Sequence, residues 1–213
     1  MATTANLWRA NLPAMFMPSS GGINWASDTI NCALYTSTWT PTPDVATGYS
    51  STNELATGSG YTQGGVALGS KTSSYTAANS YGQTWAASTA YNIGDIVRPT
   101  AGNGHLYQCA IAGTSGGSQP TWPTTRGGSV TDGGVTWVEC GYGVLSISAA
   151  SPSWTVTAAL SFRYAAFYDA TATLPVAKPF ILVVDFGATQ TGPTSGTLSL
   201  PIDANGLIII PVY

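Results

Sequence analysis

The chain has 213 residues, of which only 7% are charged, and its formal net charge at pH 7 is −3. Ordinary soluble domains carry roughly 25% charged residues. The six basic residues here are scattered, so the sequence excludes the basic surface typical of nucleic-acid-binding proteins. The longest apolar runs, 180–184 and 207–210, are too short to form a membrane-spanning helix. A hydrophobic content of 44% is enough for a packed core and argues against disorder.

The first 29 residues mix apolar and small side chains without a clean period. This pattern predicts an arm that packs on a neighbouring subunit. The candidate contact residues are Leu7, Trp8, Met15, Phe16 and Met17. The chain does not open with a basic region followed by 7–15 apolar residues, so we expect no secretory signal.

The first clear strand is expected at 30–35. Its side chains alternate between Ile30, Cys32 and Leu34 on one face and more polar or smaller neighbours on the other. A period of two is typical of a half-buried strand. A loop rich in Thr, Pro, Gly and Ser follows at 36–60. Residues 66–68 and 71–75 then predict a short strand pair or one bulged strand.

The second half of the chain predicts further strands. They are expected at 144–148, 154–157, 160–168, 180–186, 197–200 and 207–212. The segment 160–168 has the clearest alternation of the chain and is predicted to be amphipathic. Gly or Pro interrupts every candidate helix. Many short strands separated by turn residues predict an all-β fold, either a β-sandwich or a jelly-roll-like arrangement.

A Trp-, Gly- and Pro-rich segment at 84–142 interrupts this host and predicts a separate inserted module. Its strands are expected at 93–98, 106–110 and 135–139, which makes a three-stranded β module. The turns Asn103-Gly104 and Asp132-Gly133 suit tight hairpins. The host domain is then discontinuous, 1–83 and 143–213, and an insertion at a hairpin tip is tolerated because loop closure costs little. Residues near Tyr75 should therefore pair with 144–147.

Side chains for catalysis or metal binding are scarce. His105 is the sole histidine and stands beside a Gly-Asn-Gly turn, so we expect it to face solvent. Asp169 and Asp185 are the one tempting carboxylate pair, but Asp at strand ends usually forms turns. We therefore expect no enzyme activity, no metal site and no cofactor.

The three cysteines leave one question open. Cys109 and Cys140 lie in the insert and a disulfide between them is one alternative. Reduced, buried thiols are the default expectation in the absence of a secretory signal.

The aromatic residues are the one group of side chains in the insert that suggests a function. Trp85, Tyr91 and Trp137 are expected in the core, whereas Trp122, in a Pro-rich loop, is equally compatible with surface display. Aromatic faces stack on sugar rings, and neighbouring amides bind hydroxyl groups. The candidate glycan-binding residues are Trp122, Tyr107, Asn103 and Gln108.

Several host segments resemble a family of tailed-bacteriophage virion proteins. The similarity begins with the run 23–41, Ile-Asn-Trp-Ala-Ser-Asp-Thr-Ile-Asn-Cys-Ala-Leu-Tyr-Thr-Ser-Thr-Trp-Thr-Pro, and continues with Gly58-Ser-Gly-Tyr-Thr-Gln-Gly-Gly65. It then includes Arg163-Tyr-Ala-Ala-Phe-Tyr-Asp169 and the strand from Lys178 to Gly187. The resemblance covers roughly 23–76 and 144–210. It implies a structural virion protein that decorates or cements the capsid exterior.

The insert is similar to small modules related to the chitin- and cellulose-binding domains of bacterial glycosidases. The matching residues are Trp85, the run 90–97, Tyr107, Pro120-Thr-Trp-Pro123 and Asp132-Gly-Gly-Val-Thr-Trp137. The adjacent Trp-Trp pair of the hydrolase-linked versions is missing. A shared fold does not establish a shared ligand.

These resemblances lead to one expected function and two alternatives. The first is a non-enzymatic decoration protein that contacts the major capsid protein and neighbouring copies of itself, with trimers as one candidate arrangement. The second is a virion carbohydrate-recognition protein that binds host-surface glycans weakly. The third, a secreted polysaccharide-binding accessory, is disfavoured by the expected lack of a signal. No nucleic-acid or membrane partner is expected.

Overall fold

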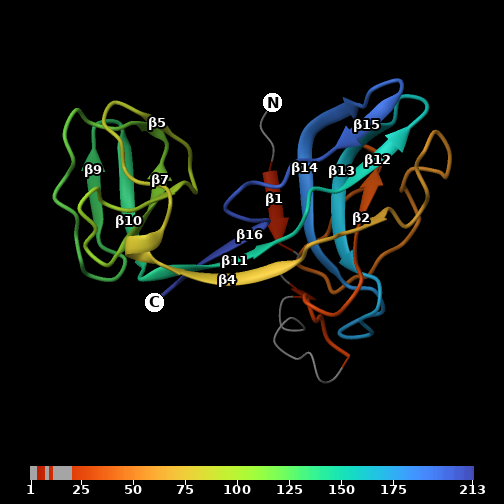
Figure 1. The fold of residues 1–213 in the computed structure, drawn as a ribbon, viewed down its shortest axis with the longest axis horizontal. Coiled ribbons are helices and arrows are strands. Elements are labelled where there is room, and N and C mark those ends of the chain that lie inside the picture. Colours follow the sequence, from red (N-terminus) through yellow and green to blue (C-terminus); the bar gives the residue numbers. More distant parts are fainter. Residues whose placement is uncertain (1–3, 8–9, 12–20) are drawn as a thin grey trace. The chain divides into compact units, whose positions relative to one another are not determined.

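The computed structural model describes residues 4–7, 10–11 and 21–213 (Figure 1). In this part of the chain all regular structure is β-strand apart from short 3₁₀ segments, at 10–11 and in η3 (Ala78–Ser80), so the predicted all-β class is confirmed. Nowhere in it is there a helix of the length and hydrophobicity needed to cross a bilayer. The chain forms two compact units. Unit 1 comprises Met1–Thr72 and Ala149–Asp203, and unit 2 comprises Ser73–Ser148 and Ala204–Tyr213.

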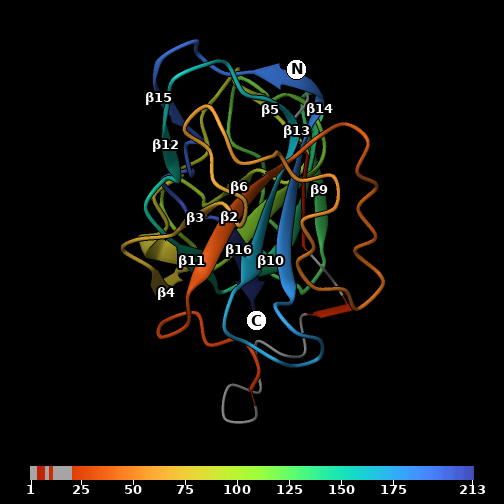
Figure 2. The ribbon, with the colours of Figure 1, turned by 90° about the vertical axis from the view of Figure 1, so that its right-hand side faces the viewer.

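Unit 1 is built on a five-stranded antiparallel sheet. Its order is β1 (Thr4–Leu7), β14 (Phe180–Thr191), β13 (Ser161–Asp169), β2 (Ile30–Tyr35) and β3 (Val66–Ala67). The three central strands run side by side in both ribbon views (Figures 1 and 2). In the register, Tyr164 of β13 lies between Tyr35 of β2 and Asp185 of β14.

β2 and most of β13 are buried on both faces, which corrects the expectation of half-buried strands at 30–35 and 160–168. The second face is covered by the loop 36–60, predicted only as a connection. Trp39 from this loop stacks on Tyr35 with ring centroids 4.1 Å apart, and Tyr49 stacks on Tyr168 at 4.4 Å. The aromatic rings thus bury the face of β2 opposite Ile30, Cys32 and Leu34.

A buried carboxylate holds the loop 49–65 against the sheet. Glu54 is 6% exposed and accepts hydrogen bonds from the hydroxyls of Tyr49 and Tyr61, both at 2.6 Å, and from Gly64 N at 2.7 Å. The Tyr61 hydroxyl in turn accepts a bond from Leu34 N of β2. A side chain at Gly65 (φ +72°) would collide with the backbone carbonyl of Cys32, so the loop approaches β2 only because this residue is glycine.

Two further strands complete unit 1 as a sandwich-like arrangement. β12 (Ser153–Val156) pairs with β15 (Gly196–Ser199), and Trp154 of β12 lies opposite Leu198 of β15. Both side chains are buried, and the Trp154 ring lies 6.1 Å from that of Tyr61. At the far edge of the main sheet, Leu7 lies opposite Leu182. Leu7, expected to contact a neighbouring subunit, therefore belongs to a strand of its own sheet. Trp8, Met15, Phe16 and Met17 fall outside the described residues.

Unit 2 contains a four-stranded antiparallel sheet, one strand more than predicted. Its order is β6 (Ile96–Val97), β7 (Leu106–Ile111), β10 (Val135–Gly141) and β9 (Ser129–Asp132). A further pair joins β5 (Ala90–Tyr91) to β8 (Gly113–Thr114). Sequence alternation missed β9 because its Ser-Val-Thr-Asp composition resembles a turn. Pairing with β10 nevertheless makes these residues a strand.

The remaining sheet of unit 2 has the order β16 (Ile208–Val212), β11 (Gly143–Ser148) and β4 (Thr72–Ala77). The predicted neighbourhood of Tyr75 and 144–147 is therefore confirmed. These strands cluster with the module rather than with the host, so unit 2 is larger than the expected insert 84–142. The physical reason is a shared core, in which Ala78, Tyr81 and Val144 pack against Ile96, Leu106 and Cys140.

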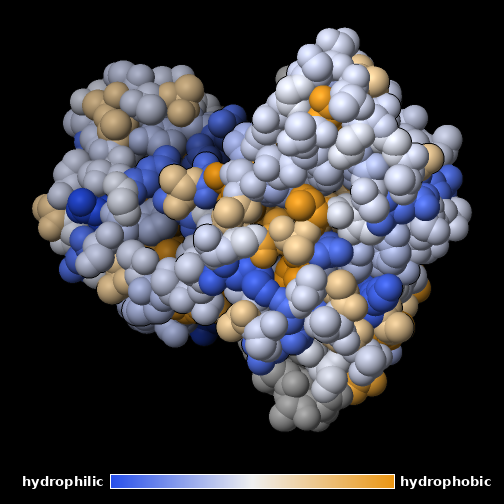
Figure 3. All heavy atoms as spheres, turned by 45° about the vertical axis from the view of Figure 1, so that its right-hand side comes forward, coloured by the Kyte–Doolittle hydropathy of each residue, from blue (hydrophilic) through white to orange (hydrophobic). Residues whose placement is uncertain are grey.

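The surface reflects the low charge of the sequence. On the face in Figure 3 most atoms have near-neutral hydropathy, and strongly hydrophilic and apolar residues form small separate groups. Such a surface repels other proteins weakly.

Candidate functional site

The core beside the four-stranded sheet of unit 2 contains a buried Asp–Trp cluster. Asp132 is 4% exposed, and its Oδ2 accepts the indole N–H of Trp85 at 2.7 Å and of Trp137 at 3.0 Å. Its Oδ1 accepts Gly116 N at 2.8 Å. Trp85, Tyr91 and Trp137 are all buried, so their predicted core role is confirmed. None of these three rings is available to a ligand.

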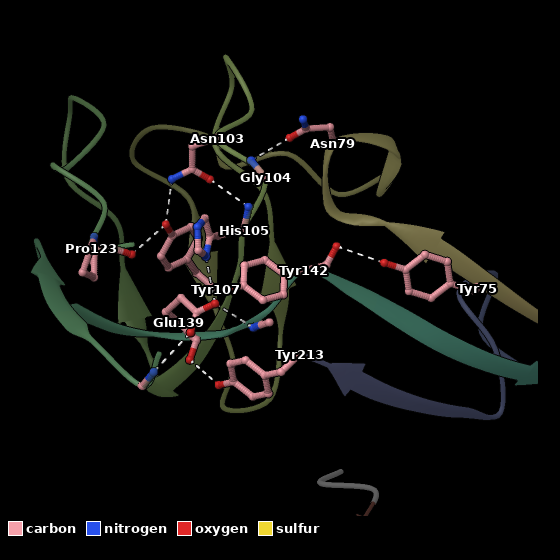
Figure 4. A network of polar contacts seen from close by, with 12 residues as sticks. Tyr75, Asn79, Asn103, Gly104, His105, Tyr107, Pro123, Glu139, Tyr142 and Tyr213 are labelled. Atoms are coloured by element: carbon pink, nitrogen blue, oxygen red, sulfur yellow. Dashed lines mark hydrogen bonds and ion pairs between the residues drawn. The ribbon is translucent and has the colours of Figure 1, made fainter. Parts of the chain in front are cut away.

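Three of the four candidate glycan residues come together beside this core. The Tyr107 hydroxyl accepts a bond from Asn103 Nδ2 at 2.7 Å and donates to the Pro123 carbonyl at 2.9 Å (Figure 4). The Trp122 ring packs on Tyr107 with centroids 4.2 Å apart. Tyr107 is fully buried, and burial raises the pKa of its hydroxyl. Tyr107 therefore cannot stack on a sugar; it fixes the loops on which Asn103 and Pro123 lie.

Trp122 and Gln108 have different surroundings. Trp122 is half-buried against Tyr107 and Trp137, and its indole N–H is buried without a hydrogen-bond partner among the described residues. Gln108 follows Tyr107 on β7, so its side chain lies on the opposite face of the strand, where it contacts the Gly94 carbonyl at 3.4 Å. The predicted set is therefore not one surface.

His105 does not face solvent, contrary to the sequence-based expectation. Its side chain is 13% exposed, and Nδ1 lies 3.0 Å from Oε1 of Glu139, which is 1% exposed (Figure 4). Glu139 also accepts the backbone N–H groups of Gly141 at 3.0 Å and Gly127 at 3.1 Å. One buried carboxylate thus joins the loop of His105, the turn at Gly127 and the end of β10.

Exposed aromatic side chains surround this buried pair. Tyr142 and Tyr213 are 51% and 50% exposed, and their rings are nearly perpendicular with centroids 6.4 Å apart. The Arg126 guanidinium lies 4.0 Å from the Tyr213 ring centre, and the His105 ring lies 4.9 Å from that of Tyr142. We call these four residues the Tyr142–Tyr213 patch.

Hydrogen bonds to the backbone fix the position of this patch. The Tyr213 hydroxyl donates to the Glu139 carbonyl at 3.0 Å, and Gly127, next to Arg126, is bound by the Glu139 carboxylate. The Tyr75 hydroxyl donates to the Tyr142 carbonyl at 3.3 Å (Figure 4). Burial is the main influence that raises the pKa of Tyr213. The patch is therefore a preformed surface of rings and hydrogen-bonding groups.

The sequence could not single out this patch. Tyr142 was expected at the end of the insert and Tyr213 in no structural element, and 71 residues separate them. The pairing of β11 with β16, which puts Gly143 opposite Val212, brings them together.

Two acidic side chains of unit 1 serve as an ion-pair partner and as a hydrogen-bond acceptor. Asp185 forms a two-pronged ion pair with Arg163, in which both N–O distances are 3.0 Å and the guanidinium holds the Asp185 pKa below its usual value. Asp169 is fully buried and binds the following turn. Among the described residues no group of three or more His, Cys, Asp or Glu side chains could hold a metal ion.

The cysteines are separate thiols. Cys32, Cys109 and Cys140 are all buried and unpaired with one another, so the alternative of a Cys109–Cys140 disulfide is wrong. Burial raises the pKa of each thiol, to about 12 for Cys140.

Comparison with known proteins returns no match: no family model, no curated protein and no solved structure is similar to this chain.

Proposed function

We propose that the protein is a non-enzymatic virion surface protein, of the capsid decoration or cement type, that attaches through unit 1 and displays unit 2. One observation carries this proposal. The segments that resemble the phage family, distant in sequence, form a single packed layer. Residues 30–35, 163–169 and 180–187 lie in the adjacent strands β2, β13 and β14.

The loop that resembles the same family packs on this layer. Tyr61 of the Gly58–Gly65 segment bonds to Leu34 N of β2 and to Glu54. The resemblance therefore describes one cooperative structure, since each of its parts needs the others for burial. A family resemblance produced by chance would have no reason to fall on segments that contact each other.

The use of buried acids also supports a structural role. Glu54, Asp132 and Glu139 are all buried, and each binds groups from two or three separate segments. Acids that act in catalysis need to reach a substrate. These carboxylates instead fix loops, as a protein under mechanical load requires.

In this proposal the protein stabilises the phage head mechanically. A protein bound across the junction of two capsid subunits removes surface from water only while both subunits are in place. The free energy of that burial opposes separation of the subunits under pressure from packaged DNA. An almost uncharged surface favours this role because it repels the capsid weakly.

The test compares phage heads with and without the protein. We expect the purified protein to bind heads that lack it and to raise the temperature at which they release DNA. The chain 1–72 joined to 149–203 should bind equally well, because unit 1 is the proposed anchor. Recovery of the protein only with tails, or no change in DNA release at full occupancy, would contradict the proposal.

A second candidate function is carbohydrate recognition by unit 2, which the Tyr142–Tyr213 patch favours. Two half-exposed rings beside a guanidinium provide stacking faces and hydrogen-bond donors. One stacked ring contributes about 1 kcal/mol, whereas a dissociation constant of 1 mM requires about 4 kcal/mol, so a single site would bind no more tightly than the millimolar range. Many copies on one particle would strengthen the binding through avidity.

This candidate is tested by applying phage heads that carry the wild-type protein or a variant to a glycan array. Binding that disappears in Tyr142→Ala and Tyr213→Ala but persists in Trp122→Ala would support the patch. The reverse pattern would support the Trp122 loop. Binding by none of the particles, including wild type, would reject glycan recognition.

A further inference from the structure

The last residue of β13, Asp169, has one saturated and one unsatisfied carboxylate oxygen. The side chain is fully buried, and Oδ1 accepts Thr171 N at 2.8 Å, Thr171 Oγ1 at 2.7 Å and Ala172 N at 2.9 Å. Oδ2 is buried as well and receives no hydrogen from any donor in the described residues. A buried polar atom without a partner is costly, so this oxygen requires an explanation.

The group that faces Asp169 is another carboxyl. The Asp28 carboxyl lies close enough to that of Asp169 for the two to form a hydrogen bond once one of them carries a proton. Asp28 accepts Asn24 N at 2.7 Å through Oδ2 and Ser27 Oγ at 3.2 Å through Oδ1. An ionised carboxylate has no hydrogen to donate, so a bond between two carboxyl groups exists only when one of them carries a proton.

We propose that Asp28 and Asp169 share a single proton, and that this proton fastens the turn 24–28 before β2 to the turn 170–172 after β13. The backbone places these turns together, because Ala170 N donates to the Thr29 carbonyl at 2.7 Å and Asp169 lies opposite Ile30 in the sheet. The residues are 141 positions apart in the chain. The shared proton closes that end of the sheet in unit 1.

The surrounding charge determines where the proton resides. Lys71 is the basic residue next to the pair, and its ammonium donates to the Asp28 backbone carbonyl. Burial raises the pKa of Asp169. Burial also tends to raise the pKa of Asp28, but hydrogen bonds from Asn24 and Asp169, together with Lys71, hold it below its usual value. The proton therefore belongs mainly to Asp169, and Asp28 is the ionised acceptor.

A bound cation is a weaker explanation of the same geometry. Two carboxylates provide few of the six to eight oxygens that Ca²⁺ prefers. The Lys71 ammonium would in addition repel a metal ion at this position.

The pair gives unit 1 an optimum of stability in pH. Because the pKa of Asp169 is higher in the folded than in the unfolded protein, Asp169 contributes stability in full when the pH is below its unfolded-state pKa. This contribution is lost as the pH rises through its folded-state pKa. The pKa of Asp28 is lower in the folded protein, so Asp28 contributes stability in full when the pH is above its unfolded-state pKa. That contribution is lost as the pH falls through its folded-state pKa. The pair carries one proton at pH values between the folded-state pKa of Asp28 and that of Asp169, and it stabilises unit 1 most in this interval. At neutral or alkaline pH the proton is lost and the two turns are held less firmly.

The decisive experiment follows the carboxyl carbon resonances of the full-length protein by NMR during a pH titration. We expect Asp169 to keep its protonated chemical shift to a higher pH than Asp185, whose pKa is lowered by Arg163. Exchange of the Thr171 and Ala172 amide hydrogens should accelerate as Asp169 titrates. Titration of Asp169 at or below the usual Asp range would overturn the proposal.

Asp169→Asn provides a second readout. Asparagine retains an acceptor for the Thr171 and Ala172 donors and supplies a permanent N–H to Asp28. We expect a melting temperature about 2–4 °C above wild type at pH 8 and little difference near pH 4.5. Asp185→Asn, which removes an ion pair, should show no such gain at pH 8. A lower melting temperature for Asp169→Asn at pH 8 would contradict the shared proton.

Calcium distinguishes the cation from the proton. Millimolar Ca²⁺ should leave the melting temperature of wild type unchanged. A rise in wild type that is absent from Asp169→Asn would assign the site to a metal ion and overturn the proposal.

Discussion

The indole nitrogen of Trp85 lies 2.7 Å from Oδ2 of Asp132, and this bond joins the segment before β5 to the end of β9, 47 residues later. The same oxygen binds Trp137. A single carboxylate thus orients two large rings in a module with a small core, for which such internal ties matter most.

Replacement of Asp132 should therefore destabilise unit 2 severely. Asp132→Ala leaves two indole N–H groups and Gly116 N without their acceptor, and each buried unsatisfied group costs about 1–3 kcal/mol. We expect a loss of about 3 kcal/mol or more in urea unfolding. Asp95→Ala, which removes one exposed turn bond to Asn92 N, should cost about 1 kcal/mol or less. Equal losses for the two variants would show that Asp132 has no special role.

The stability of unit 2 should depend more on the Glu139 carboxylate than on the His105 imidazole that contacts it. Glu139→Ala leaves Gly127 N and Gly141 N without acceptors, and we expect a loss of about 2–4 kcal/mol. His105→Ala removes one partly exposed partner and should cost about 1 kcal/mol. Urea unfolding of both variants measures the difference. A His105 variant as unstable as the Glu139 variant would mean that the ion pair, rather than the backbone bonds, holds the loops.

Excision of unit 2 should leave a folded protein. Ala150 N donates to the Gly69 carbonyl at 2.9 Å, so the ends left by removal of 73–148 are already adjacent. We expect the chain 1–72 joined to 149–203 by a short Gly linker to unfold cooperatively. Deletion of 84–141 alone should lower solubility, because it exposes Ala78, Tyr81 and Val144, which lose their partners Ile96 and Leu106. A soluble, cooperative 84–141 deletion would favour the narrower module boundary.

The thiols should be inert in the native protein. With a pKa of about 12, roughly one Cys140 in ten thousand is ionised at pH 8, and the thiolate is the reactive form. We expect no reaction with a disulfide reagent at pH 8 in native buffer, and three reactive thiols per chain in denaturant. Rapid labelling of one thiol under native conditions would reveal a local opening of the core.

Local patterns in the sequence predicted several strands of both units. The strand at 30–35 begins and ends as expected, and those predicted at 144–148, 154–157 and 207–212 lie within one or two residues of their predicted bounds. Burial was less predictable, because alternation cannot reveal that Trp39 and Tyr49 return to cover the second face.

The candidate site was harder to predict because its contacts are distant in sequence. A polar turn beside His105 suggested solvent, whereas a carboxylate 34 residues later receives the imidazole. Trp122 attracted attention as an aromatic residue in a loop, but stacking on Tyr107 half-buries it. The half-exposed rings of Tyr142 and Tyr213 carry no sequence motif that would single them out.

Four of the nine acidic residues, Glu54, Asp132, Glu139 and Asp169, are buried. The protein consequently presents even less charge to solvent than its sequence implies. Mobile ions screen exposed charges within about 10 Å at 0.1 M salt, but they have little to screen on this surface. The electrostatic contribution to the rate and strength of binding to any partner should therefore vary little between low and high salt concentrations.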